Sequence, residues 1–236
     1  MTDRNSVPLA ARTVSTAPGG HLVIVGAGEW AAVAFERFCR DSPYEVVAFS
    51  AEAGHLGADL CRGLPLVPLA DLAMTYPPGR YVAFVAAPSW PSQARRRLYD
   101  IVKSAGYACA SYVSRRVFAV RNVQIGENTF VHERAALQHM VRIGDNVIVG
   151  SGTCIGHNAV VADDCFVGQR VAISGLCRIG RGCFLGAGSC VDAAVSVADG
   201  CVLRPGTVVL KDTKPDLVYS GNPAHPDVAA VSACPR

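Results

Sequence analysis

The chain has 236 residues, which is enough for one or two domains. Half of them are apolar, 17% are charged and the net charge is +3, so the composition excludes intrinsic disorder for most of the chain. The 22 Lys and Arg residues form no dense basic block, which argues against nucleic acid as the main partner. Aromatic residues make up only 7%, beside 23 Gly and 10 Cys, and this balance favours a core of small and branched side chains.

The first twenty residues are polar, contain Pro and Gly, and lack the apolar stretch of a signal peptide. We expect residues 1–20 to form a disordered tail. No run in the chain approaches the roughly 20 apolar residues of a membrane helix, because Gly and charged residues interrupt every candidate. We therefore expect a cytoplasmic protein without membrane insertion, whose cysteines are free thiols. No pair of Cys-x-x-Cys motifs indicates a structural zinc site.

Residues 21–112 alternate apolar strands with helical stretches. Strands are expected at residues 21–25, 44–50, 81–87 and 107–113. One helix is expected after the first strand, ending near residue 40, and a second at residues 92–105. This alternation predicts a parallel sheet flanked by helices, the organisation of a small Rossmann-like α/β domain.

The turn after the first strand reads Gly-Ala-Gly-Glu-Trp-Ala over residues 26–31. Such a turn lets the backbone approach an anion at a helix N-terminus, so Gly26, Gly28 and Glu29 are candidate substrate-binding residues. Gly-rich turns also occur for packing alone. The acidic residue that binds a ribose in dinucleotide folds is absent from residues 49–51, and Glu52 comes slightly late. A full dinucleotide site is thus disfavoured, while a smaller site for a nucleotide-linked substrate and a purely structural domain both stay open.

The second half of the chain is a six-residue repeat. From residue 125 onward, every sixth residue is aliphatic in an unbroken series: Ile125, Val131, Leu137, Ile143, Val149, Ile155, Val161, Val167, Ile173, Ile179, Leu185, Val191, Val197, Leu203 and Val209. The residue four places later is never larger than Val: Thr129, Ala135, Val141, Val147, Thr153, Ala159, Cys165, Val171, Cys177, Cys183, Ser189, Val195, Cys201 and Thr207. A sandwich or barrel would instead show a period of two with turn signals every 8 to 12 residues, as is usual for such folds.

This pattern resembles the left-handed parallel β-helix of the hexapeptide-repeat acyltransferases. The resemblance implies a triangular prism in which three hexads form one 18-residue coil, with the aliphatic residues inside and the small residues near the corners. We expect the β-helix to span residues 113–210, beginning with two weaker hexads at 113–118 and 119–124. Residues 211–236 are expected to form a C-terminal cap and tail.

A small Rossmann-like domain that leads into a left-handed β-helix resembles the sugar acyltransferase family. That family includes sialic acid O-acetyltransferases and the bacillosamine-pathway and perosamine N-acetyltransferases. The most specific motifs are Ile-Gly-His-Asn-Ala-Val at 155–160, Val-Ala-Ile-Ser-Gly at 171–175 and Tyr-Ser-Gly-Asn-Pro-Ala at 219–224. The resemblance implies a homotrimer with acetyl-CoA bound between subunits, and a sugar substrate, often nucleotide-linked, used for surface polysaccharide or glycoconjugate. It also implies a catalytic His157 and contacts with the cofactor at Gly175, Ala193, Pro223 and Ala224.

The chemistry of acyl transfer separates the six histidines. The reaction needs a base for the attacking amine or hydroxyl and a donor for the oxyanion on the thioester carbonyl, and His suits the first role near neutral pH. His139 and His157 differ by 18 residues and share the third hexad position, so with Gly175 and Ala193 they form one exterior column with a rise of about 4.8 Å per coil. We predict that His157 is the general base and that His139 contacts the substrate. Asn158 follows the base and can hydrogen-bond to it, but supplies no negative charge.

Two alternative functions and a run of three arginines were also considered. A zinc hydratase of the γ-carbonic anhydrase type needs three histidines per metal, and the spacing of His132, His139 and His157 does not match that family, so no metal is expected. A non-catalytic trimeric scaffold stays open. The three arginines at 95–97 fall on the second predicted helix, where we expect a solvated face.

Overall fold

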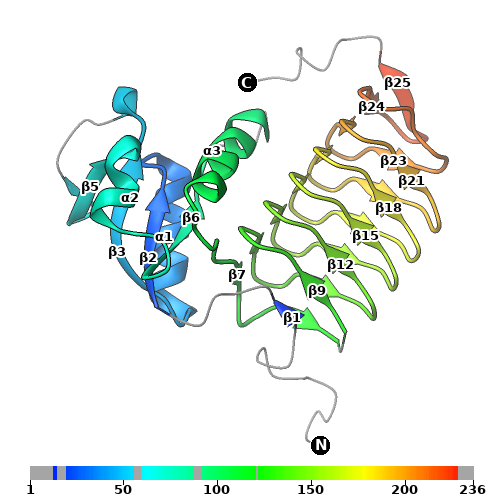
Figure 1. Ribbon diagram of the computed structural model, residues 1–236. Coiled ribbons are helices and arrows are strands. Elements are labelled where there is room, and N and C mark those ends of the chain that lie inside the picture. The colour runs from blue at the N-terminus through cyan, green and yellow to red at the C-terminus, as the bar shows by residue number, and fades with distance from the viewer. Residues whose placement is uncertain (1–12, 15–19, 56–59, 88–91, 121, 228–236) are drawn as a thin grey trace, which may run out of the picture. The chain divides into compact units, whose positions relative to one another are not determined.

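The computed structural model describes residues 13–14, 20–55, 60–87, 92–120 and 122–227 (Figure 1). Contacts divide the chain into an α/β unit of residues 15–114 and a β-helix unit of residues 1–14 and 115–236. Most of the expected N-terminal tail and the last nine residues lie outside the described residues. Thr13–Val14 nevertheless form a short strand, β1, paired with the β-helix, so a wholly disordered tail at 1–20 is wrong at these two positions.

The α/β unit contains one five-stranded sheet in the order β4-β5-β3-β2-β6. Its elements are β2 (His21–Val25), α1 (Glu29–Asp41), β3 (Glu45–Ala51), η2 (Ala53–His55), β4 (Leu60–Cys61), β5 (Leu64–Pro68), η3 (Leu69–Asp71), α2 (Leu72–Thr75), β6 (Tyr81–Val85) and α3 (Ser92–Ser104). All neighbouring strands pair in parallel except β4 with β5. Among the described residues, no helix is long and apolar enough to cross a membrane.

Most of the predicted α/β elements are present, with two differences. β5 was not expected, because Pro65 and Pro68 are uncommon within strands. The segment nevertheless pairs with β3 near the edge of the sheet. The strand predicted at 107–113 is instead a single bridge between Ala83 and Cys109, followed by the two-residue strand β7 (Tyr112–Val113).

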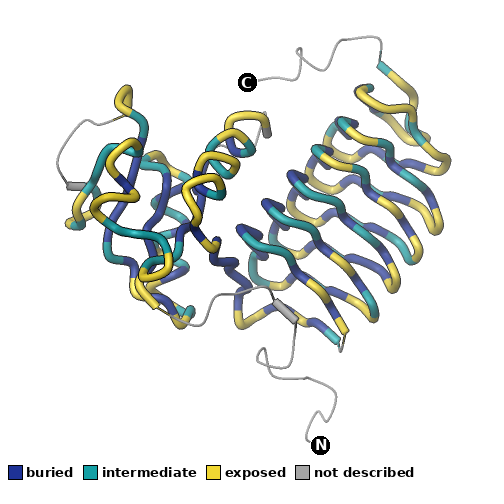
Figure 2. Tube along the Cα trace, viewed as in Figure 1, coloured by how far each residue is buried: buried dark blue, intermediate teal, exposed yellow. Residues whose placement is uncertain are grey.

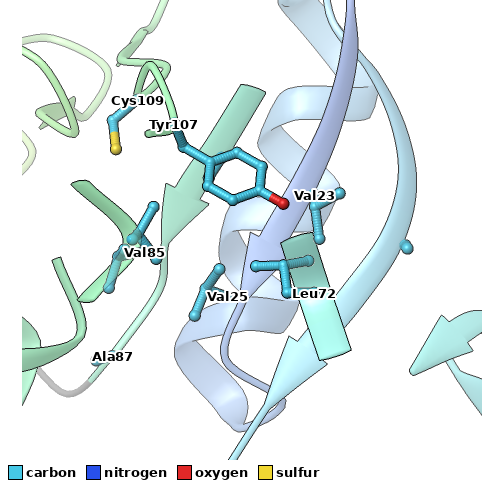
Figure 3. Packing of buried hydrophobic residues seen from close by; sticks show 10 residues of the cluster. Val23, Val25, Leu72, Val85, Ala87, Tyr107 and Cys109 are labelled. Carbon is cyan, nitrogen blue, oxygen red and sulfur yellow. The ribbon is translucent and has the colours of Figure 1, made fainter. Parts of the chain in front are cut away.

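Both faces of the sheet are covered, which explains the uninterrupted apolar strands. On one face, Phe38 of α1 packs against Phe84 of β6 with ring centroids 5.0 Å apart. On the other face, Val23, Val25 and Val85 pack in one cluster with Leu72 of α2 (Figure 3). Tyr107 belongs to this second cluster, and its hydroxyl donates a hydrogen bond to the Tyr76 carbonyl. Burial raises the pKa of Tyr107 above its ordinary value.

The β-helix unit is built from two- and three-residue strands on three faces. The first face contains β1, β9 (Gln124–Ile125), β12 (Arg142–Ile143), β15 (Val160–Val161), β18 (Arg178–Ile179) and β21 (Ser196–Val197). The second contains β7, β10 (Phe130–Val131), β13 (Ile148–Val149), β16 (Phe166–Val167), β19 (Phe184–Leu185), β22 (Val202–Leu203), β24 (Val218–Ser220) and β25 (His225–Asp227). The third contains β8 (Phe118–Ala119), β11 (Ala136–Leu137), β14 (Cys154–Ile155), β17 (Ala172–Ile173), β20 (Cys190–Val191) and β23 (Val208–Val209).

The register confirms the 18-residue coil. Ile155 pairs with Ile173, which pairs with Val191, and the same step recurs on the other faces. Successive strands of one face therefore run parallel, as β9, β12, β15, β18 and β21 do in Figure 1. Every residue of the aliphatic series is at most 3% exposed, and every residue of the small series at most 6%. The buried positions recur along each coil in Figure 2.

The small interior residues also hydrogen-bond between coils. The hydroxyl of Thr153 donates to the carbonyl of Gly168 at 2.7 Å, 15 residues later. The thiols of Cys165 and Cys183 make the equivalent bonds to Gly180 and Ala198 at 3.0 and 3.1 Å. Burial raises the pKa of Cys177 and Cys201, two further members of the series. These cysteines thus fill the narrow interior, and their thiols also hydrogen-bond to backbone carbonyls of the next coil.

One corner of the prism, between the first and second faces, holds a ladder of buried amides. Asn128 donates from Nδ2 to Oδ1 of Asn146, and Asn146 donates to Oδ1 of Asp164, both at 2.9 Å. Asn128 and Asn146 have φ values of 50° and 58°, in the left-handed region that Asn tolerates. Asp164 ends this ladder 3.6 Å from the Nε of Arg181.

We predict that Asn146→Ala destabilises the β-helix, because it removes the hydrogen bonds that link Asn146 to the buried side chains of Asn128 and Asp164. The substitution should lower the free energy of unfolding by about 2–3 kcal/mol more than Asn122→Ala does. Asn122 is a matched control, because it has a φ of 67° but is exposed. Denaturant unfolding of both variants checks this, and equal losses would mean that the ladder contributes nothing beyond its backbone conformation.

Candidate functional site

The corner after the third face carries the predicted histidine column. The Asn158 amide donates to the carbonyl of His139 at 2.8 Å, and the Leu176 amide donates to the carbonyl of His157 at 2.8 Å. One coil further, the Ala194 amide donates to the carbonyl of Gly175 at 2.9 Å. His139, His157, Gly175 and Ala193 therefore occupy equivalent places on successive coils, as their 18-residue spacing predicts.

The ring of His157 lies directly against the backbone of Gly175. A Cβ built on Gly175 would stand 2.5 Å from Nε2 and 2.8 Å from Cε1 of His157, so only glycine accommodates the ring in this position. His157 is exposed. The N–H of Gly175 makes no hydrogen bond within the described part of the chain. A solvent-accessible imidazole thus lies next to an unused backbone donor.

Two side chains hold His157. Its backbone N–H donates to Oε1 of Gln138 at 3.1 Å, and its Nδ1 lies 3.2 Å from Nδ2 of Asn158. An amide can turn either its NH2 or its carbonyl oxygen toward the ring. With Nδ2 toward Nδ1, the ring proton sits on Nε2. With Oδ1 there, Nδ1 carries the proton and Nε2 keeps a free electron pair, which faces Gly175.

The other histidines of the repeat and Cys154 differ in where they lie relative to this column. His139 is exposed one coil before His157. His132 lies at another corner, with Nδ1 3.9 Å from Oε2 of Glu133 and its ring 4.8 Å from that of Phe130. Within the described ranges, no three His, Cys, Asp or Glu side chains are grouped to hold a metal ion. Cys154 points outward on the third face and is half-buried.

The predicted cofactor contacts at Pro223 and Ala224 lie at the end of the third face. The Ala224 amide donates to the carbonyl of Val208 at 2.8 Å. Val208 is three coils beyond Cys154 in the strand register, which corresponds to about 14 Å along the axis. The third face therefore extends from the coil of His157 to the segment containing Pro223 and Ala224.

The α/β unit has a pocket of about 720 Å³ at the carboxyl ends of β2, β3 and β6. In open α/β sheets this edge is where ligands bind. The pocket is bordered by all three residues predicted from the Gly-rich turn, Gly26, Gly28 and Glu29, together with apolar and charged residues from α1, α3 and the end of β3.

The two glycines of the turn have different roles. Gly26 has a φ of 134°, and a Cβ there would lie 2.1 Å from the carbonyl oxygen of Ala86, so its absence of a side chain serves packing between the strand ends. Gly28 has no atom within 4 Å of such a Cβ. It is the N-cap of α1 and makes no side-chain capping bond. Gly28 therefore leaves the helix N-terminus open toward the pocket, where anions are favoured.

An ion pair borders the same pocket. Nη1 of Arg97 is 2.8 Å from Oε1 of Glu52, and Nη2 binds Oε2. Arg97 holds the pKa of Glu52 below its ordinary value. The expected solvated face for the arginines at 95–97 is wrong at Arg95, which is buried, whereas the side chains of Arg96 and Arg97 are 43% and 54% exposed and pair with Asp100 and Glu52. Sequence reasoning missed the Glu52–Arg97 pair because 45 residues separate its members.

Comparison with known proteins shows the same repeat. Residues 122–157 match the bacterial transferase hexapeptide family, and residues 177–211 match the hexapeptide repeat of succinyl-transferase. A comparison with curated protein sequences gave no match.

Several solved structures share the fold across both units. The acetyltransferase domain of PglB from Neisseria gonorrhoeae is 22% identical with a TM-score of 0.79, covering 87% of this chain and 98% of that domain. PerB from Caulobacter crescentus, solved with CoA and GDP-perosamine, is 25% identical with a TM-score of 0.76, covering 90% of this chain and 99% of PerB. WeeI from Acinetobacter baumannii is 19% identical with a TM-score of 0.59, covering 88% and 99% of the two chains.

An α/β unit followed by a left-handed hexapeptide prism defines the chain as a hexapeptide-repeat acyltransferase. Within that class, solved structures of perosamine N-acetyltransferase share the fold of both units at 24–25% identity.

We predict that Gly175→Ala displaces the ring of His157, because the added methyl group would stand only 2.5 Å from Nε2. The backbone of Gly175 is not in the left-handed region, so the variant should fold. A crystal structure of the variant, or the imidazole NMR signals of His157 assigned with His157→Gln, would detect the displacement. An unmoved ring would contradict the close packing described above.

Proposed function

We propose that this protein is an acetyl-CoA-dependent transferase that acetylates an amino or hydroxyl group of a sugar, with His157 as the general base. The observation that carries the proposal is the contact between an exposed imidazole and the bare backbone of Gly175, one coil apart on the prism corner. Solved relatives support it: the PglB domain was crystallised with acetyl coenzyme A, and PerB with CoA and GDP-perosamine.

In the proposed reaction, Nε2 of His157 accepts the proton of the attacking amine or hydroxyl. The nucleophile adds to the thioester carbonyl, and the tetrahedral intermediate expels the thiol of CoA. The N–H of Gly175 has no partner among the residues that the structure describes, and it is suited to donate to the oxyanion. For Nε2 to be free, Nδ1 must carry the ring proton, so Asn158 presents Oδ1 to it in the reactive state. Asn158 therefore acts by selecting the tautomer of His157.

Acetyl-CoA would lie along the third face. This face extends from the coil of His157 to Ala224, whose amide is bound to Val208. Gly175, Ala193, Pro223 and Ala224 are the cofactor contacts in this arrangement, and His139 contacts the sugar. His139 and His157 are exposed at this corner, so the proposal includes a homotrimer in which a neighbouring prism covers them.

The α/β pocket would hold the nucleotide of a nucleotide-linked sugar. Its volume of about 720 Å³ lies in the range of small-molecule sites. The open N-terminus of α1 at Gly28 suits a phosphate group. We propose that the acetylated sugar serves surface polysaccharide or glycoconjugate synthesis in the cytoplasm.

His157→Ala should reduce kcat roughly 100- to 10,000-fold, because the variant lacks the base. His139→Ala should instead raise KM for the sugar with a smaller change in kcat. His225→Ala is the matched control, since His225 is exposed in β25 and outside the proposed machinery. Acetyl transfer from acetyl-CoA is measured, with sedimentation to show that all variants keep the mass of a trimer. Turnover close to that of the wild type in His157→Ala would refute the assignment of the base.

Asn158→Asp tests the role of the amide. An aspartate would accept a hydrogen bond from Nδ1–H in both protonation states of the ring and would stabilise the imidazolium, so a higher pH is needed to free Nε2. The acid limb of the profile of kcat/KM against pH should therefore move to higher pH, with turnover above that limb at least equal to that of the wild type. A profile that does not move would mean that residue 158 does not bind Nδ1 during catalysis.

A further inference from the structure

We propose that the side chain of Leu176 limits the acyl group of the donor to acetyl, because it occupies the space into which a longer chain would extend from the thioester carbonyl. Leu176 is then a specificity-determining residue. This role rests on the proposed function, in which an acyl-CoA is the donor.

Leu176 directly follows the residue whose N–H is suited to hold the oxyanion. The amide of Leu176 donates to the carbonyl of His157 at 2.8 Å, so Leu176 lies one coil after Asn158 at the same corner. Two side chains flank Gly175 along the chain: Ser174 is polar and half-buried, whereas Leu176 is apolar and 54% exposed. Leu176 is thus the apolar group next to the proposed position of the thioester carbonyl.

The path of CoA determines where the acyl group points. In the proposed arrangement, CoA lies along the third face, whose strand β17 ends at Ile173, just before the corner. In a thioester, the sulfur and the acyl chain leave the carbonyl carbon on different sides. With the sulfur toward the third face and the oxygen at the N–H of Gly175, the acyl chain extends across the corner toward the residues after Gly175. The first side chain there is that of Leu176.

The backbone of Leu176 also points to a ligand. Its φ of 65° lies in the left-handed region, where a bulky residue is an outlier. More than half of the side chain is exposed, so burial within this chain does little to offset the strain. Residues held in such conformations cluster at active sites and ligand clamps. A methyl group of the donor would bury against this side chain, whereas a longer chain would collide with it.

The test uses calorimetric titration of the full chain with acetyl-CoA and with butyryl-CoA, whose acyl chain is longer by two methylene groups. The wild type should bind butyryl-CoA roughly 10- to 100-fold more weakly, the factor for forcing extra methylene groups into a filled space. Leu176→Gly should reduce this ratio to below about 3, because it opens that space to the longer chain. Glycine adopts a positive φ without strain, so the variant should fold, and its melting temperature checks this.

Met140→Gly is the matched control. Met140 is apolar, lies at the equivalent position two coils before Leu176 and has a φ of 60°. The substitution relieves the same kind of backbone strain but leaves the space after Gly175 unchanged. The ratio of the two dissociation constants should therefore stay that of the wild type. Sedimentation shows whether both variants keep the mass of the wild type.

A wild-type ratio near 1, an unchanged ratio in Leu176→Gly, or an equal fall in Met140→Gly would overturn the inference. A loss of mass in Leu176→Gly with an unchanged ratio would mean that Leu176 contacts a neighbouring subunit instead. If the ratio does not respond but His157→Ala abolishes acetyl transfer, the proposed function stands without this role of Leu176. If the wild type binds neither acyl-CoA, the proposed function and the inference both fail.

Discussion

The narrow interior of the prism is the constraint on which the rest of the structure depends. Each hexad places one aliphatic and one small side chain inside, and neither series shows an exposed member. Because the interior accepts nothing larger, the chain must complete a coil every 18 residues without insertions over the repeat. This fixed step brings His157 beneath Gly175, although nothing in the local sequence of either residue requires their contact.

The three corners have similar backbone conformations but carry different side chains. At one corner these side chains are buried and bind one another, and at another they are exposed. At the corner with Asn146 and Asp164, polar side chains bind one another and are buried. At the corner with the histidine column, the residues in the same left-handed conformation include Asn158 and Leu176, with φ values of 56° and 65°. Leu176 is 54% exposed, and a bulky residue seldom adopts this conformation. This corner thus leaves its side chains free to meet ligands.

The sequence was most informative where its pattern is periodic. The six-residue repeat predicts the interior residues and the column of His139, His157 and Gly175, because stacking depends only on spacing. The alternation of strands and helices predicts most of the α/β unit. It does not predict β5, because the two prolines of this strand are typical of loops.

Nonlocal pairing explains what could not be predicted. The three consecutive arginines point about 100° apart around α3, as in any α-helix, so Arg95 is buried, Arg96 pairs with Asp100 and Arg97 reaches Glu52. Which arginine does which depends on how α3 docks on the sheet. The orientation of Asn158 is likewise a property of the folded corner, because the amide offers both a donor and an acceptor.

The coil-to-coil register also determines how the protein can change in length during evolution. A chain that gains or loses a single residue within the repeat would turn every later aliphatic side chain out of the interior, whereas a gain of 18 residues adds a whole layer. Layers added after the coil of Gly175 would leave its contact with His157 intact, because each coil touches only its neighbours. They would, however, move the segment at Ala224 away from the histidine by a fixed increment. In the proposed arrangement, the number of coils between His157 and Ala224 would set the length that acetyl-CoA has to span.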